Sequence, residues 1–123
     1  MALSRIDHVT IRVNDLARSR AFYAEALGLV DGARPAFPFP GAWLWLDDRA
    51  VVHLVGGGES SADDTGAFDH VAFAPTDLES TRARLGKAGI VFRETKVPGL
   101  PLHQLFFKDP DGVSIELNVA LEK

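Results

Sequence analysis

Three histidines and one glutamate occupy matching positions in the two halves of this chain. Ile-Asp-His-Val around His8 returns as Phe-Asp-His-Val around His70, 62 residues later. Each half ends in an alternating apolar run that carries one more potential ligand, His53 or Glu116, which follows the first histidine by 45 or 46 residues. Imidazole nitrogens and a carboxylate oxygen suit divalent transition metals. We therefore predict that His8, His53, His70 and Glu116 bind one divalent ion per site.

The repeat is what favours a metal site over a structural role. A single histidine in an amphipathic strand is more often a structural residue than a ligand, but two histidines at one repeated register are a stronger signal. An unpaired buried carboxylate costs several kcal/mol, which a divalent cation at Glu116 would offset. The residues do not choose among iron, nickel, cobalt, manganese and zinc.

Four residues of the first half are candidates for contact with a small-molecule substrate. Thr10 and Arg12 share the His8 face of an alternating strand. Arg12 is either a clamp for a substrate carboxylate or a salt-bridged residue at the rim. Trp43 and Trp45 share one face of their own strand, where they would line an apolar pocket, make a dimer contact or belong to the core.

In the second half, strand alternation selects the residues that accompany Glu116. Counting back through the preceding turn places Gln104 and Phe106 on the same face as Glu116. His103 has no counterpart in the first half, and we expect it at the surface or rim.

Alternation, prolines and capping residues predict the elements that position these side chains. Asn14 or Asp15 would cap the first helix, Asp77 the second, and Gly28 would end the first. We expect Leu16, Phe22, Tyr23 and Leu27 to form the buried stripe of the first helix. Three prolines between positions 35 and 40 rule out a central strand and predict a stiff loop. The expected order is strand 6–13, helix 15–27, extended segment 29–35 and hairpin 41–46/50–55, then strand 68–74, helix 77–88 and strands 90–96, 103–108 and 113–119.

This order predicts an α+β fold of two βαβββ modules that form one cupped sheet. The modules would span residues of about 5–57 and 67–120, joined by a linker of about 58–66, within a single domain 1–123. Helices would cover one face of each sheet, while the other face carries the predicted ligands and forms the cup.

Composition narrows the classes of function. A formal charge of −4 over 123 residues, without a cluster of Lys and Arg, argues against nucleic-acid binding. The apolar runs are too short for a membrane span, and the first residues lack the apolar core of a signal peptide. With no cysteine, the chain forms no disulfide and has no thiolate ligand, and we expect a cytoplasmic protein.

The motifs resemble the vicinal oxygen chelate superfamily of glyoxalases, bleomycin-resistance proteins and extradiol dioxygenases. The likeness rests on DHVTIRVNDLARSRAFYAEALGL, AVVHLV, DHVAF and LFFKDPDGVSIEL, and it covers nearly the whole chain. It implies that His8, His53, His70 and Glu116 stand at the ligand positions of the family. It also implies that Arg12 matches an arginine that holds glutathione in glyoxalase I, and that Trp43, Trp45, Phe106 and Ser114 line the pocket.

The resemblance implies a metal-dependent enzyme with glyoxalase-like lyase or isomerase chemistry on an oxygen-chelating substrate. Glu116 would move protons and His53 would be a second base. Glyoxalase I usually has a glutamate where this chain has His53, which argues against lactoylglutathione lyase activity itself. One alternative is an extradiol-type ring-cleaving dioxygenase. The other is a bleomycin-type drug-binding protein, although such proteins generally lack the ligands.

We also expect a homodimer, because a sheet with one bare apolar face must be buried against another. In a two-fold symmetric dimer, His8 and His53 of one chain would meet His70 and Glu116 of the partner chain. Pairing within one chain is the alternative.

Overall fold

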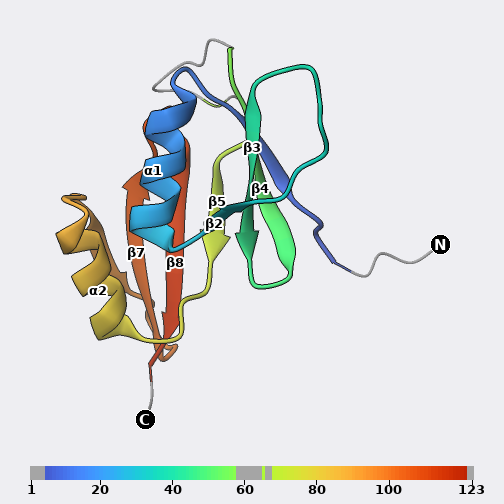
Figure 1. The fold of residues 1–123 in the computed structure, drawn as a ribbon. Helices are drawn as coiled ribbons and strands as arrows, with labels where there is room; N and C mark the ends of the chain where they lie inside the picture. Colours follow the sequence, from blue (N-terminus) through green and yellow to red (C-terminus); the bar gives the residue numbers. More distant parts are fainter. Residues whose placement is uncertain (1–4, 58–64, 66–67, 122–123) are drawn as a thin grey trace. The chain divides into compact units, whose positions relative to one another are not determined.

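A computed structural model describes residues 5–57, 65 and 68–121. The chain divides into two compact units, residues 1–60 and 61–123, here called module 1 and module 2. Each has the order βαβββ (Figure 1), which confirms the predicted fold class. Module 1 contains β1 Val9–Arg12, α1 Leu16–Leu27, β2 Val30–Gly32, β3 Gly41–Leu46 and β4 Arg49–Val55, and module 2 contains β5 His70–Phe73, α2 Leu78–Lys87, β6 Arg93–Lys96, β7 Leu102–Lys108 and β8 Ser114–Ala120.

The two sheets share one topology. Their strand orders are β1-β4-β3-β2 and β5-β8-β7-β6, so the last strand of each module lies beside its first. This pairing is parallel, and the remaining pairs are antiparallel. The repeat in the sequence is therefore a repeat of structure. That both modules fold as one domain stays a prediction.

Alternation divides the module 1 sheet into a covered face and an open face. The helix α1 contacts β2, β3 and β4. The covered face carries buried side chains from β1, β3 and β4: Ile11, Ala42, Leu44, Val52 and Leu54. On the open face, Thr10 of β1 pairs with His53 of β4, which pairs with Trp43 of β3. These three side chains are therefore lateral neighbours.

The predicted buried stripe of α1 was right only for Tyr23. The helix buries Ser19, Tyr23 and Ala26, whereas Leu16, Phe22 and Leu27 are half-buried. Ser19 and Ala26 lie four residues before and three residues after Tyr23, on the same helical face. Small side chains at these positions leave room for the tyrosine ring, so hydrophobicity alone identified the wrong neighbours.

Both helices begin where the sequence predicts. The carboxylate of Asp15 accepts a hydrogen bond from the backbone N–H of Arg18 at 3.1 Å, and that of Asp77 accepts from Ser80 at 2.8 Å. Gly28 ends α1 with φ of 71°, a left-handed conformation that favours glycine. Each cap fixes the direction of the helix that returns the chain to its sheet.

The first strand differs from expectation, whereas the proline-rich segment does not. The first strand begins at Val9 and ends at Arg12, so His8 lies one residue before β1 rather than inside it. Residues 33–40 contain neither helix nor strand, as the three prolines predict. The predicted linker of about 58–66 lies outside the described residues, apart from Thr65.

In module 2, α2 is joined to the sheet by an ionic cluster. Arg82 of α2 donates to both carboxylate oxygens of Glu94 on β6, at 2.9–3.2 Å. Nε2 of His103 on β7 lies 2.8 Å from Glu94 Oε1. The His103 side chain is 19% exposed, so it is half-buried rather than open to solvent. Its register opposite Val119 places it on the other face of the sheet from Glu116.

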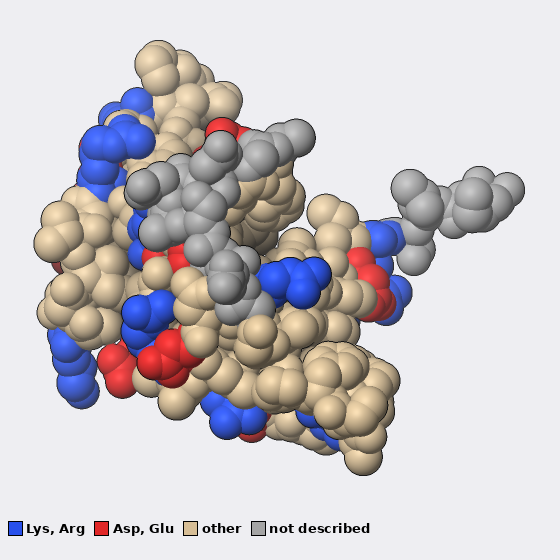
Figure 2. Space-filling view, turned by 90° about the horizontal axis from the view of Figure 1, so that it is seen from above, with Lys and Arg blue, Asp and Glu red and all other residues tan. Residues whose placement is uncertain are grey.

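Over the face shown in Figure 2, basic and acidic side chains are interspersed, and no broad basic area of the kind that nucleic acid binds is seen there. Neither described helix is long and apolar enough to cross a membrane.

Candidate metal and substrate site

Module 1 brings His8 and His53 together. Their rings are stacked, with centroids 3.7 Å apart and planes inclined by 11°. His53 comes from the centre of β4 and His8 from the residue that precedes β1, the strand beside β4. The two predicted ligands of this half are therefore adjacent.

One nitrogen of each ring already has a partner. His8 Nδ1 lies 2.8 Å from Asp7 Oδ2, and His53 Nε2 lies 3.2 Å from the carbonyl oxygen of Ala50. A carbonyl oxygen only accepts, so Nε2 of His53 carries the hydrogen and Nδ1 keeps its lone pair. Burial lowers the pKa of His53, and the neighbouring His8 lowers it further. The neutral His53 ring can therefore offer Nδ1 to a cation or a proton.

Both histidines line a pocket of about 390 Å³ within module 1, a size typical of small-molecule sites. Of the predicted substrate-binding residues, Thr10 and Trp43 belong to its lining, while Arg12 and Trp45 do not. The Trp45 indole N–H instead donates to the Ala33 carbonyl oxygen at 3.1 Å. The full lining consists of Asp7, His8, Thr10, Arg34, Phe37, Phe39, Trp43, His53, Leu54 and Val55.

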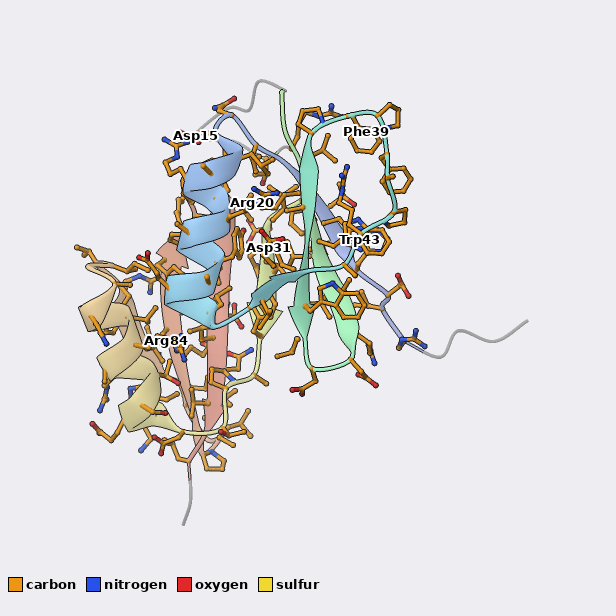
Figure 3. All side chains as sticks on the ribbon, viewed as in Figure 1. Asp15, Arg20, Asp31, Phe39, Trp43 and Arg84 are labelled. Carbon is orange, nitrogen blue, oxygen red and sulfur yellow. The ribbon has the colours of Figure 1, made fainter. Side chains whose placement is uncertain are left out.

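Sequence reasoning missed the contribution of the loop between β2 and β3. Arg34, Phe37 and Phe39 lie on this loop and line the pocket with Trp43. Figure 3 shows Phe39 and Trp43 on the side of the module 1 sheet away from α1. The sequence did contain one signal for this contribution. Two phenylalanines lie between prolines, in a stiff segment that cannot be a central strand, so their apolar side chains had no predicted place in the sheet.

Module 2 brings His70 and Glu116 together. His70 Nε2 lies 3.4 Å from Glu116 Oε1, and His70 Nδ1 lies 2.9 Å from Asp69 Oδ2. The hydrogen bond to Asp69 raises the pKa of His70, and Glu116 adds to the effect. When His70 is neutral and its hydrogen is on Nδ1, a bare nitrogen faces a carboxylate oxygen. Only a proton or a cation between them satisfies both, so this pair fits a divalent metal.

A hydrogen-bond network holds the Glu116 carboxylate, whose side chain is only 13% exposed. Gln104 Nε2 donates to Glu116 Oε2 and to Asn118 Oδ1, both at 3.1 Å. Phe106 pairs with Glu116 across β7 and β8, and Ser114 pairs with His70 across β8 and β5. The predicted residues Gln104, Phe106 and Ser114 therefore share the face of the two ligands.

Each module thus supplies two of the four predicted ligands, each pair on one face of its sheet. Over its described residues, neither module alone gathers three histidine or carboxylate side chains that could hold an ion. The set of His8, His53, His70 and Glu116 stays a prediction that requires both pairs.

Comparison with known proteins connects this arrangement to one group. Residues 5–117 match the Glyoxalase/Bleomycin resistance protein/Dioxygenase superfamily. A probable lactoylglutathione lyase of Vibrio parahaemolyticus is 35% identical over 95% of this chain and 91% of its own length. Glutathione transferase FosA of Serratia marcescens is 33% identical over 96% and 82%. The crystal structure of a glyoxylase/bleomycin resistance protein/dioxygenase domain from Frankia sp. EAN1pec superposes with a TM-score of 0.80 at 26% identity, covering 97% of this chain and 99% of that one.

Proposed function

The chain belongs to the glyoxalase/bleomycin resistance/dioxygenase superfamily, and from this premise we propose that it is a divalent-metal-dependent enzyme acting on a small oxygen-bearing substrate. Members of the superfamily typically bind a divalent metal. The proposed reaction class is lyase or isomerase chemistry, in line with relatives named lactoylglutathione lyase. We propose that the enzyme works in the cytoplasm as a homodimer.

The observation that carries the proposal is the placement of His70 Nε2 at 3.4 Å from Glu116 Oε1. The other His70 nitrogen is occupied by Asp69, and the other Glu116 oxygen by Gln104. When His70 is neutral, both atoms that face each other are acceptors, and a proton or a metal cation between them satisfies both. His8 and His53 would complete the ligand set, because the hydrogen bond of each ring engages only one of its two nitrogens. A bound divalent ion would act as a Lewis acid on substrate oxygen.

The residues of the chain would supply proton transfer and positioning. Glu116 has one oxygen held by Gln104, which orients its carboxylate to accept a proton at Oε1. When His53 is not bound to the metal, its Nδ1 is the second candidate base, because Ala50 holds the opposite nitrogen in its protonated form. Thr10, Trp43 and Phe106 would contact the substrate, with Ser114 and Gln104 at the edge of the carboxylate; Arg12 and Trp45 remain candidates outside the module 1 pocket.

Metal content tests the proposal. We would purify wild type, His70→Ala and Glu116→Ala without an affinity tag that releases nickel, and measure metal by elemental analysis. Wild type should retain about one divalent ion per chain, and both variants should lose most of it. Asp48→Ala, on the exposed β3–β4 turn, is the matched control. Equal metal content in all four proteins would rule out the proposed site.

A further inference from the structure

Five aromatic rings form a continuous row along the module 1 pocket. From the loop inward they are Phe39, Phe37, Trp43, His53 and His8. Successive centroids are separated by 5.2, 6.4, 4.1 and 3.7 Å. Apart from the tilted contact of Phe37 with Trp43, neighbouring planes lie within 16° of parallel. The row lines the pocket with aromatic rings from the solvent-exposed loop to the predicted metal ligands.

Phe37 and Phe39 are each 42% exposed, although both are large apolar side chains. Three prolines restrict the backbone around them, so the rings are held in place without being buried. Two exposed phenyl rings stacked on a stiff loop at the wall of a pocket are typical of a recognition surface rather than of a core.

Arg34 adds a positive charge at the outer end of the row. Its guanidinium carbon lies 5.3 Å from the Phe37 ring centroid and 5.2 Å from that of Phe39. Nη2 donates to the carbonyl oxygen of Phe39 at 2.9 Å. Gly41 leaves room for this group, since a Cβ there would come within 2.9 Å of Nη2. The guanidinium is therefore preorganised on the loop.

The charges around the pocket favour an anionic ligand near Arg34. No carboxylate of the described residues forms an ion pair with Arg34, and it is the one lysine or arginine in the lining. Asp7 also lines the pocket, but its oxygens are engaged by His8 and Arg5 at 2.8 and 3.4 Å. A guanidinium with unused N–H donors recognises carboxylate and similar oxyanions. The same charge disfavours a cationic ligand, which the aromatic rings alone would attract.

We propose that this pocket binds a small organic anion with a flat unsaturated ring. The ring lies against Phe37, Phe39 and Trp43, and the anionic group binds Arg34. This inference deepens the proposed function, because it names the class of substrate that would reach the metal ligands. It makes Arg34 the residue that determines charge specificity.

The experiment uses matched probes and the metal-free full chain. Phenylacetate, 2-phenylethanol and benzyltrimethylammonium have similar rings and carry negative, neutral and positive groups. Binding to ¹⁵N-labelled protein treated with a chelator is followed by the indole N–H signals of Trp43 and Trp45. The variants are Arg34→Met, Arg34→Lys and Phe39→Leu, and Arg18→Met on the exposed face of α1 is the control.

Phenylacetate should shift the Trp43 signal more than that of Trp45 and bind about tenfold more tightly than 2-phenylethanol. Arg34→Met should remove this preference, Arg34→Lys should keep part of it, and Arg18→Met should leave it intact. Phe39→Leu should weaken the binding of phenylacetate and of 2-phenylethanol by a similar factor. The inference is overturned if the alcohol or the ammonium binds as well as phenylacetate, if folded Arg34→Met retains the preference, or if Trp43 does not respond. Metal content, measured separately, distinguishes that failure from failure of the proposed function.

Discussion

Oδ2 of Asp69 lies 2.9 Å from Nδ1 of His70, and the same two atom types of Asp7 and His8 lie 2.8 Å apart at the equivalent point of the other module. In both pairs the carboxylate holds the Nδ1 hydrogen, which leaves Nε2 as the nitrogen for a cation. Metal-bound histidines commonly donate their second N–H to a carboxylate, which fixes the tautomer and raises ligand basicity. The repeat has thus duplicated a histidine together with the residue that orients it.

We predict that Asp69→Ala weakens divalent metal binding by about 10–100-fold, with a smaller loss for Asp69→Asn. Alanine removes the acceptor for Nδ1–H, whereas asparagine keeps an oxygen but loses the charge. Metal affinity is measured by calorimetry and the His70 tautomer by ¹⁵N chemical shifts in metal-free protein. Asp48→Ala serves as the control. An unchanged tautomer and affinity in Asp69→Ala would show that the pair is only a surface ion pair.

The order of elements was predictable because local signals agreed with the tertiary structure. Alternation located β4 and β8, and Asp15 and Asp77 marked the helix starts through their capping side chains. The buried face of α1 was not predictable from hydrophobicity, because Ser19 and Ala26 are buried for their size. Their position depends on what packs around Tyr23, which the helix sequence does not specify.

We predict weak or absent isomerisation of the methylglyoxal–glutathione hemithioacetal by the wild type. The resemblance to glyoxalase I places His53 where those enzymes usually have glutamate, and a neutral imidazole whose lone pair is held by the metal is a poorer proton acceptor than a carboxylate that can leave the metal. His53→Glu should raise turnover by about tenfold or more if the rest of the site suits this substrate. Rapid wild-type turnover, or a large loss in His53→Glu, would contradict this reasoning.

The candidate site was predicted in part, for a similar reason. The pairing of β7 with β8 places Gln104 and Phe106 on the Glu116 face, so counting alternate residues along the strand was sufficient to predict them. Arg34 was missed because its loop has no periodicity, and its place in the pocket depends on contacts with Phe37 and Phe39. The place of Trp45 was also not predictable from alternation, because a register shift lies between Leu44 and Trp45. Its indole N–H donates a hydrogen bond to the Ala33 carbonyl oxygen.

Acid should weaken the contact between α2 and β6. The bidentate hydrogen bonds from Arg82, with a contribution from His103, lower the pKa of Glu94 below the ordinary value of 4.5. A lowered carboxylate pKa stabilises the fold above the ordinary value, and this stabilisation is lost as the pH falls through the native value. At pH 7, Glu94→Gln should lower the melting temperature by about 4 °C.

The difference between wild type and Glu94→Gln should shrink below about pH 4.5 and disappear once Glu94 is protonated. Melting curves recorded by circular dichroism from pH 7 to pH 3 provide the measurement. Asp48→Asn, at the exposed hairpin turn, should show no such pH-dependent difference. A gap that stays constant across the range would show that Glu94 acts through packing instead of charge.

Subunit exchange tests where the two ligand pairs combine. His8 and His53 belong to module 1, and His70 and Glu116 to module 2, so a complete site needs one pair of each kind. We predict a two-fold symmetric homodimer in which the His8 and His53 pair of one chain meets the His70 and Glu116 pair of the partner chain. His8→Ala and His70→Ala should each lose most metal when alone, and their mixture should recover one complete site per heterodimer, because one chain keeps His8 and the other keeps His70. Sites formed within single chains would recover none, and a monomer by light scattering at micromolar concentration would contradict the dimer itself.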